Sequence, residues 1–337
     1  MFPKEEITGL FKKFEQLNIL IIGDVMIDAY LWGDVDRISP EAPVPIVTVK
    51  KRANRLGGAA NVALNIKAMG ANPILCSVVG HDEKADTFLE LMDKREMVSG
   101  GILKSKNRLT TTKFRVIGNN TQMLRVDEEM ENPLNNEDQK DFTNLIKTIF
   151  TQYRIDGVIF QDYDKGVITP ALIKKVTTLA DKHSVPVAVD PKKRNFADYK
   201  NLKLFKPNLK ELREGLGTDF EKTDMESLRK AVRLVHENQA IEIVLATLSE
   251  EGVFVSRKID STHYEEHLLP AHVRSIADVS GAGDTVVSLA TLCLALDLSI
   301  KDMAAISNLA GGQVCESVGV VPVDREKLLK ELSGFEK

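Results

Sequence analysis

The sequence predicts an α/β fold in which a mostly parallel sheet is covered by helices on both faces. From residue 137 onward, segments with helical and strand patterns alternate regularly, which is the order that a parallel sheet with helical crossovers requires. The expected strands are short apolar runs, as in strands buried on both faces. Only the early strands near 44–50, 110–117 and 122–127 interrupt the alternation. We expect them to form a small separate sheet, a lid.

The first half of the chain opens with a buried strand at 18–23 that ends in a glycine. A second, more exposed strand is expected at 44–50, because prolines punctuate its approach. The remaining elements of this half are a helix at 57–70 with a glycine pair at its start, a strand at 74–79, a helix at 84–95, and a hairpin of strands at 110–117 and 122–127 around Gly118, Asn119 and Asn120.

The second half supplies most of the expected parallel sheet. Helices are expected at 137–150, 170–182 and 225–237, with a short helix from Asn208, and strands at 157–160, 187–189, 203–205, 241–246, 253–255 and 264–269. No long linker separates these segments. We therefore expect a single domain over residues 1–337, with lid strands from about 28–52 and 107–128.

The composition is ordinary for a globular protein and argues against several classes of partner. Hydrophobic residues make up 43% and charged residues 28% of the chain, and the net charge of −4 gives no electrostatic attraction for nucleic acid. No apolar run is long enough to span a bilayer, and the charged, amphipathic start differs from a signal peptide. The three cysteines lie far apart without metal spacing. We expect a cytoplasmic protein that binds neither nucleic acid nor membrane.

The segment from Asp278 to Asp284, Asp-Val-Ser-Gly-Ala-Gly-Asp, carries the clearest chemical signal. A glycine turn at the start of a helix presents backbone N–H groups and the positive end of the helix dipole, which favour an anion. A carboxylate beside a bound phosphate would repel it. Asp284 is better explained as a base that takes the proton of a hydroxyl attacking that phosphate. The alternative is a plain connection in which glycine allows positive φ.

Other nucleotide-binding and hydrolytic signatures are missing. No glycine is followed by lysine, which excludes a Walker A loop, and the patterns Gly-x-Gly-x-x-Gly, Gly-x-Ser-x-Gly and His-Glu-x-x-His do not occur. If the protein binds a nucleotide phosphate, the turn of Gly281, Ala282 and Gly283 is the candidate phosphate-binding site. We assign no role to Asp278.

Two further segments carry candidate ligand contacts. Gly57 and Gly58 let a ligand approach the backbone closely, and Asn61 offers both a donor and an acceptor. Packing of small residues between helix and sheet explains the same pattern. Asp28 follows the first strand at its carboxyl end, where ligands of open α/β sheets bind, and its carboxylate can accept hydrogen bonds from two sugar hydroxyls. A turn-forming aspartate is the alternative.

A candidate magnesium site follows the strand at 203–205. Mg²⁺ prefers oxygen ligands and keeps several of its waters, so Asn208 and Glu211 can hold it partly through water. The same two residues fit a helix capping box, with Asn208 as the cap and Glu211 three residues later. Both interpretations stay open at this point.

Together these segments resemble the ribokinase (PfkB) family of sugar kinases, over about residues 19–323. Residues 278–284 look like the C-terminal signature of that family, residues 57–61 like its N-terminal signature, and residues 207–211 like its magnesium motif. Residues 247–252 resemble its nucleotide loop, with Ser249 in place of a glycine. The resemblance implies a ribokinase-like three-layer sandwich with a β lid, and an enzyme that uses ATP with Mg²⁺. A monovalent cation is left open.

The resemblance also implies a role for each candidate residue. Asp284 would be the catalytic base, and the N–H groups of Gly281, Ala282 and Gly283 would stabilise the transferring phosphoryl group. The sugar would contact Asp28, Gly57, Gly58 and Asn61. The nucleotide would contact Asn208, Thr247, Gly252 and Asn308, with Glu211 and Asn208 near Mg²⁺.

Four segments are similar to a narrower group in this family, which phosphorylates D-glycero-D-manno-heptose 7-phosphate on its anomeric 1-hydroxyl. They are residues 37–45, 125–127, 162–166 and 190–192. The product would be the 1,7-bisphosphate, in ADP-heptose and lipopolysaccharide core precursor synthesis. A 7-phosphate needs a cationic pocket, for which Arg125, Lys165 and Lys192 are the candidates, with ordinary surface charge as the alternative.

Several expectations about the whole protein follow from this likeness. Bifunctional members of the group carry a nucleotidyltransferase domain with a His-x-Gly-His motif, which this sequence lacks, so we expect a stand-alone kinase. A homodimer through the lid strands is also implied, since an exposed sheet edge invites pairing. Two other functions stay open: another sugar or sugar-phosphate kinase of the family, of fructose, fructose phosphate or ribose type, or a non-catalytic regulator that binds a sugar or nucleotide on the same fold.

Overall fold

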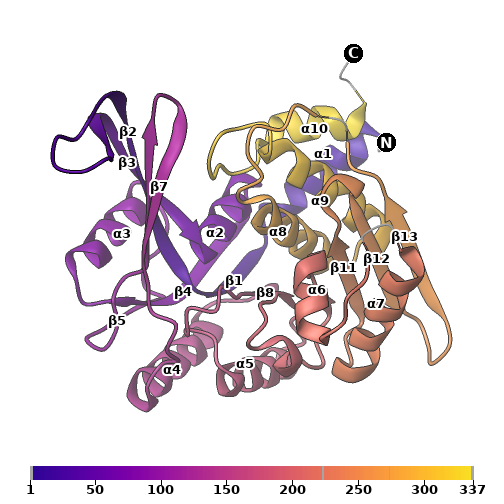
Figure 1. The fold of residues 1–337 in the computed structure, drawn as a ribbon. Coiled ribbons are helices and arrows are strands. Elements are labelled where there is room, and N and C mark those ends of the chain that lie inside the picture. The colour runs from indigo at the N-terminus through magenta and orange to yellow at the C-terminus, as the bar shows by residue number, and fades with distance from the viewer. Residues whose placement is uncertain (1–2, 222–223, 273, 335–337) are drawn as a thin grey trace.

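The computed structural model describes residues 3–221, 224–272 and 274–334, which form an α/β fold with two sheets (Figure 1). The strands of the larger sheet are β1 (Asn18–Gly23), β4 (Asn72–Gly80), β5 (Ile102–Ser105), β8 (Gly157–Gln161), β9 (Val187–Asp190), β10 (Leu204–Phe205), β11 (Ile243–Thr247), β12 (Val253–Lys258) and β13 (Tyr264–Leu269). Their order is β13-β12-β11-β10-β9-β8-β1-β4-β5. Only the pairs β11–β12 and β12–β13 are antiparallel, so the prediction of a mostly parallel sheet is confirmed.

Helices cover both faces of this sheet, and each face has its own apolar core. One face packs against α1 (Lys4–Phe14), α2 (Ala59–Ala68), α3 (Glu83–Asp93), α8 (Ala282–Ala295), α9 (Ile300–Val314) and α10 (Arg325–Ser333). The other packs against α4 (Asn136–Gln152), α5 (Pro170–Lys182), α6 (Leu209–Leu216) and α7 (Met225–Gln239). In β1, Ile19 and Ile21 enter the first core, whereas Leu20 and Ile22 enter the second. This alternation of side chains produces the expected three layers.

The four early strands form a separate sheet, which we call the lid sheet. They are β2 (Val25–Ile38), β3 (Pro45–Gly58), β6 (Thr112–Gly118) and β7 (Thr121–Glu128), in the order β3-β2-β6-β7. Figure 1 shows this sheet projecting from one end of the molecule. The predicted hairpin is confirmed, because β6 and β7 are joined by Asn119 and Asn120 with φ of 50° and 63°. Positive φ at both central residues is typical of the tight turns that suit twisted hairpins.

Three details of the sequence-based assignment are wrong. The predicted lid range of about 28–52 covers most of β2, but no separate strand was assigned there, because residues 25–30 are buried on both faces and show no polar alternation. Asp28 therefore lies within β2, and the alternative of a turn-forming aspartate is wrong. The pair Gly57 and Gly58 ends β3, and α2 begins only at Ala59. The short strand β5 was also missed.

Five polar residues lie at the same edge of the large sheet, where its parallel strands end. Asp24, Gln161, Asp190, Lys206 and Thr247 lie at or directly after the carboxyl ends of β1, β8, β9, β10 and β11. In doubly wound sheets, ligands bind at this edge. Two short 3₁₀ turns, η1 (Phe196–Asp198) and η2 (Ser249–Glu251), complete the secondary structure of the described residues. Among these residues, none of the helices has the length and apolar character needed to cross a bilayer.

Candidate active site

Asp284 lies in the first turn of α8, directly after the glycine turn. Gly281 caps this helix with φ of +86°, a conformation that a side chain would strain. The helix is buried nearly all round, and Asp284 itself is buried. The turn therefore directs a carboxylate and a helix N-terminus into the protein, as the sequence predicts.

Three side chains donate hydrogen bonds to the Asp284 carboxylate. Asn61 Nδ2 bonds to Oδ2 at 2.8 Å, and Tyr163 OH and Gln161 Nε2 bond to Oδ1 at 2.6 and 3.1 Å. Burial raises the pKa of Asp284 to about 6, while the bonds from Asn61 and Tyr163 act in the opposite direction. Such a carboxyl group is mostly ionised near neutral pH yet basic enough to take a proton.

The start of α8 offers backbone donors to an anion. The first intrahelical bond runs from Thr285 N to Gly281 O at 3.0 Å, so the N–H groups before it have no partner in the helix. Ala282 N–H does have a partner, because it donates to Val279 O at 3.3 Å. For Ala282 to contact an anion, this long turn bond must open. Gly283 carries no such bond to residue 279 or 280.

A buried lysine lies against this helix start. Lys206 is 2% exposed, and its Nζ lies 3.0 Å from Asp190 Oδ1. A Cβ placed on Gly283 would lie 3.3 Å from the same Nζ. Gln161 Nε2 links the two acids, because it donates to Asp190 Oδ2 at 3.1 Å as well as to Asp284. Lys206 and Asp190 therefore place a buried ion pair beside the predicted anion site, with the ammonium at 3.3 Å and the carboxylate at 3.7 Å from a Cβ on Gly283.

A cavity of about 480 Å³ opens from the helix start and holds the predicted nucleotide contacts. Its lining includes Asp284, the turn at 281–283, Lys206, Asn208, Glu211, Thr247, Gly252 and Asn308. Ser249 also lines it and has φ of +55°. This serine adopts the left-handed conformation that suits a glycine, so it keeps the loop geometry despite the substitution.

The capping-box interpretation of the 208–211 segment is confirmed. Asn208 Oδ1 accepts from Glu211 N, and Glu211 Oε2 accepts from Asn208 N, both at 2.8 Å. The other oxygen of Glu211 contacts Lys192 Nζ. Burial opposes the charge of Lys192, but the carboxylates of Asp190 and Glu211 raise its pKa. One carboxylate oxygen of Glu211 thus caps the helix, and the other contacts Lys192 in the cavity.

The predicted sugar contacts Asp28, Gly57, Gly58 and Asn61 do not line this cavity. Of these residues, Asn61 donates its hydrogen bond to Asp284. A Cβ on Gly57 would lie 2.3 Å from Asp28 Oδ2. Gly58 has φ of +62°, and its Cα lies against the backbone carbonyl of Asp24. Glycine is therefore required at both positions for local packing. Asn61 Oδ1 is buried and has no hydrogen-bond partner among the described residues, so it is an acceptor open to a ligand.

Each of the three predicted phosphate-binding cations is paired with at least one carboxylate. Lys192 lies in the cavity beside Glu211. Arg125 lies on β7 and pairs with Asp127 at 3.0 Å. Lys165 Nζ lies 2.8 Å from Glu129 and 3.0 Å from Glu131. Lys113 Nζ lies 3.0 Å from Asp127 and 3.2 Å from Glu129, so one chain of ion pairs links Arg125 to Lys165, whereas Lys192 pairs with Glu211.

Sequence reasoning did not select Gln161, Tyr163, Asp190 or Lys206 as functional residues. Three of the four end an apolar strand or directly follow one, at the edge where ligands bind. A polar residue at the carboxyl end of each expected parallel strand was the available signal. Tyr163 lies two residues after β8, and only the structure brings its hydroxyl to Asp284.

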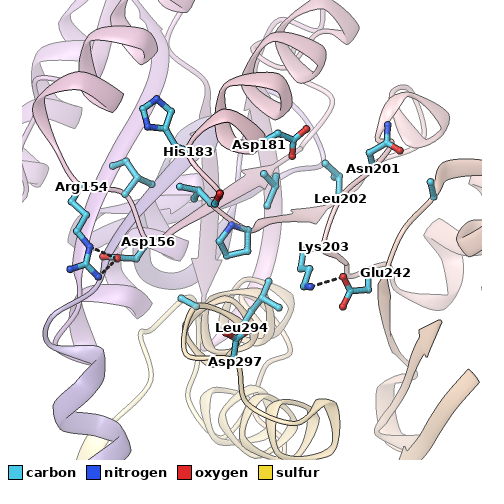
Figure 2. A pocket seen from close by; sticks show the side chains of 17 residues that line it. Arg154, Asp156, Asp181, His183, Asn201, Leu202, Lys203, Glu242, Leu294 and Asp297 are labelled. Carbon is cyan, nitrogen blue, oxygen red and sulfur yellow. Dashed lines mark hydrogen bonds and ion pairs between the residues drawn. The ribbon is translucent and has the colours of Figure 1, made fainter. Parts of the chain in front are cut away.

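A second cavity, of about 780 Å³, lies at the opposite edge of the sheet (Figure 2). It is lined by residues that precede β8, β9, β10 and β11 and by the C-terminal end of α8. Its charged groups include two ion pairs, Arg154 with Asp156 at 2.7 Å and Lys203 with Glu242 at 2.5 Å. None of the predicted site residues lines this cavity.

Comparison with known proteins supports the same family. Residues 16–326 match the family described as "pfkB family carbohydrate kinase". The "Bifunctional protein HldE" of Helicobacter pylori (strain HPAG1) is 38% identical over 313 residues, which are 92% of this chain and 65% of that protein. Its counterpart in Aliarcobacter butzleri (strain RM4018) is 36% identical over 322 residues, 95% of this chain and 65% of that protein. The chain thus spans about two thirds of these relatives.

Solved structures of two kinases share the fold. Phosphofructokinase-2 from Escherichia coli, in complex with potassium, superposes with a TM-score of 0.74 at 17% identity, over 95% of this chain and 98% of that one. Arabidopsis thaliana ribokinase, in complex with ribose and ATP, gives a TM-score of 0.70 at 16% identity, over 93% and 98%. The predicted ribokinase-like fold is therefore confirmed.

Proposed function

The chain belongs to the pfkB family of carbohydrate kinases, and from that premise we propose that it phosphorylates D-glycero-D-manno-heptose 7-phosphate. The γ-phosphoryl group of ATP is transferred to the anomeric 1-hydroxyl, which gives the 1,7-bisphosphate used for ADP-heptose and lipopolysaccharide core precursors. The observation that carries the phosphoryl transfer is the buried carboxylate of Asp284 at a helix N-terminus that offers anion donors.

Asp284 acts as the base through one particular oxygen. Oδ1 already accepts from Tyr163 and Gln161, whereas Oδ2 accepts only from Asn61. The free lone pair of Oδ2 therefore takes the proton of the sugar hydroxyl as its oxygen attacks the γ-phosphorus. Asn61 fixes that oxygen and turns its own unpaired Oδ1 toward a ligand donor.

The transferring phosphoryl group lies against the start of α8. Backbone N–H groups at Gly281 and Gly283 stabilise its charge, joined by Ala282 once its bond to Val279 opens. Lys206, packed against Gly283 and paired with Asp190, brings its ammonium group to the same site. Because it is buried, this charge is only weakly screened by solvent.

The nucleotide occupies the adjoining cavity, with Thr247, Gly252 and Asn308 on its walls. Asn208 and Glu211 would hold a magnesium ion partly through water, because they provide an amide and a buried carboxylate whose second oxygen faces the cavity beside Lys192. Among the described residues no group of three or more acidic, histidine or cysteine side chains could hold a metal by itself. When bound, Mg²⁺ would neutralise charge on the phosphates.

The choice of heptose 7-phosphate is supported by the four segments at 37–45, 125–127, 162–166 and 190–192 and by the 36–38% identity to bifunctional HldE proteins. Asp28, Gly57, Gly58 and Asn61 would contact the sugar ring. Arg125, Lys165 and Lys192 stay the predicted contacts to the 7-phosphate, and each is paired with a carboxylate in the free protein.

A comparison of substrates tests this function. ADP release is measured with heptose 7-phosphate, fructose 6-phosphate, fructose and ribose, and the values of kcat/KM are compared. The proposal predicts the highest kcat/KM for the heptose phosphate. A higher value for any other sugar would contradict the substrate assignment, and sugar binding without ADP release would indicate a non-catalytic regulator.

Tyr163 gives a prediction about pH dependence. Its hydroxyl stabilises the ionised form of Asp284, so Tyr163→Phe should raise the pKa of that base above its value of about 6. The acid limb of kcat/KM should then move to higher pH. The measurement is a pH profile from about pH 5 to about pH 9, with the exposed Tyr153→Phe as the matched control. An unmoved acid limb would show that Tyr163 does not act on Asp284.

The protein assembles as a homodimer through the lid sheet. Leu124 and Val126 of β7 are 56% and 44% exposed, and they point away from the face that carries Arg125. An exposed apolar sheet face of this kind suits a second copy of the same chain. Sedimentation velocity should give a dimer for the wild type and a monomer for the double variant Leu124→Glu, Val126→Glu. A dimer that survives both changes would exclude this interface.

A further inference from the structure

One face of the lid sheet carries a cluster of basic side chains. In the strand register, Arg55 lies opposite Asp28, Arg115 opposite Tyr30, and Arg125 opposite Arg115. Residues directly opposite each other point to the same side of a sheet, and so do residues two apart in one strand. These five side chains therefore share one face. Because Asp28 lies against Gly57, this face is directed at the predicted sugar site.

Positive charge on this face is only partly neutralised. Arg115 pairs with Asp28 at 2.5 Å, but no carboxylate of the described residues lies within 4.0 Å of the Arg55 guanidinium. Both guanidinium groups lie over the ring of Tyr30, with centroid distances of 5.0 Å for Arg55 and 5.3 Å for Arg115. On this face the basic side chains of Arg55, Lys113, Arg115 and Arg125 outnumber the carboxylates of Asp28 and Asp127, and Asp278 is a further carboxylate near Arg115.

This charge lies on the sugar side of Asp284 and not on the nucleotide side. Arg55 Nη1 donates to Val320 O at 3.3 Å. A Cβ on Gly281 would lie 3.4 Å from Val320 Cγ1 and 3.0 Å from Asn61 Nδ2, so Arg55 is tied to the wall shared by the base and Asn61. The cavity that holds the nucleotide contacts is lined by none of the lid residues.

We propose that Arg55 and Arg115 bind a phosphomonoester at the end of the sugar remote from the hydroxyl that is phosphorylated. The proposal rests on the proposed sugar kinase function and specifies its substrate class as a sugar phosphate. A guanidinium group presents parallel N–H donors that match two phosphate oxygens. Arg55 has donors free for this contact, and the Tyr30 ring holds both groups in place before the substrate binds.

The test compares two lid variants that remove the same charge. Arg55→Met removes the proposed contact. Arg52→Met is the matched control, because Arg52 is exposed on the same strand but lies opposite Leu31, on the other face of the lid sheet. Kinetics are measured with heptose 7-phosphate and with unphosphorylated D-glycero-D-manno-heptose. For Arg55→Met, KM for the phosphorylated sugar should rise roughly 10-fold or more, as expected for a lost charged hydrogen bond.

The other kinetic constants separate this contact from general damage. In Arg55→Met, KM for ATP, kcat, and kcat/KM for the unphosphorylated sugar should stay within about twofold of wild type. Arg55→Lys keeps the charge and should give an intermediate KM. If Arg55→Met does not fold, as judged by its melting curve, the lysine variant decides, and a wild-type KM in it then overturns the proposal.

Several results of these measurements would overturn the phosphate subsite. Four of them would each leave the kinase function intact. In Arg55→Met they are an unchanged KM for the phosphorylated sugar, an equal loss of kcat/KM with both sugars, or a change confined to KM for ATP. The fourth is an equal rise of KM for the phosphorylated sugar in Arg52→Met. A wild-type protein that prefers the unphosphorylated heptose would overturn the subsite together with the proposed substrate.

Discussion

Replacing Asp284 by asparagine should lower kcat by roughly 10²–10⁴-fold, the contribution that general base catalysis typically makes. The amide has no lone pair basic enough to accept the hydroxyl proton. ATP binding should change little, because the cavity walls at Thr247, Gly252 and Asn308 are untouched. The measurement is steady-state turnover together with the dissociation constant of ATP, determined by calorimetry. Near wild-type turnover would remove Asp284 from its role as the base.

The stability of the same variant provides its control. The pKa of Asp284 is raised in the folded protein from 3.8 to about 6. Folding therefore favours the protonated form, and this contribution to stability is lost as the pH rises through about 6. A neutral asparagine avoids that cost and should stabilise the protein at pH 7 by about 1 to 3 kcal/mol. A higher melting temperature with lost turnover shows that the activity is not lost through unfolding.

Replacing Lys206 by methionine should destabilise the protein by roughly 3–5 kcal/mol, the typical result of removing one partner from a buried ion pair. Lys206 is 2% and Asp190 4% exposed, so water can reach the remaining carboxylate only from the cavity that both residues line. Gln161 still donates one hydrogen bond to Asp190, but this does not replace the lost charge. The free energy of unfolding in urea measures the effect.

Two further variants separate the buried pair from general effects of lysine loss. Adding Asp190→Asn to Lys206→Met removes the unpaired charge and should recover most of the lost stability. Lys192→Met should cost less, because the side chain of Lys192 is 31% exposed and solvent screens its contact with Glu211. Equal losses for the two single lysine variants would contradict the special position of Lys206.

The sequence predicted local elements better than contacts between distant segments. The helix at 170–182 and the strand at 264–269 match the structure at both ends, because apolar periodicity and turn residues are local signals. The hairpin turn at Asn119 and Asn120 was also predictable, since its residue types suit positive φ. By contrast, β2 was missed because its first six residues are buried on both sides.

For the site, a motif located Asp284 but did not reveal its partners. Asn61 bonds to Asp284 across 223 residues of sequence, and Tyr163 across 121. Such contacts depend on how the strands are ordered, which periodicity does not determine. The same limit applies to the lid cations. Arg125 was selected from sequence, whereas the register of four strands was needed to place Arg55 and Arg115 beside Asp28.

The central claim is that Asp284 directs phosphoryl transfer to the anomeric hydroxyl of a heptose 7-phosphate. The most direct measurement is phosphorus-31 NMR of the product formed from ATP and D-glycero-D-manno-heptose 7-phosphate, by the wild type and by Asp284→Asn. The account predicts a bisphosphate whose new phosphate is coupled to the anomeric proton, formed by the wild type and almost absent with the variant. A new phosphate on any other carbon, or equal product from both proteins, would contradict it.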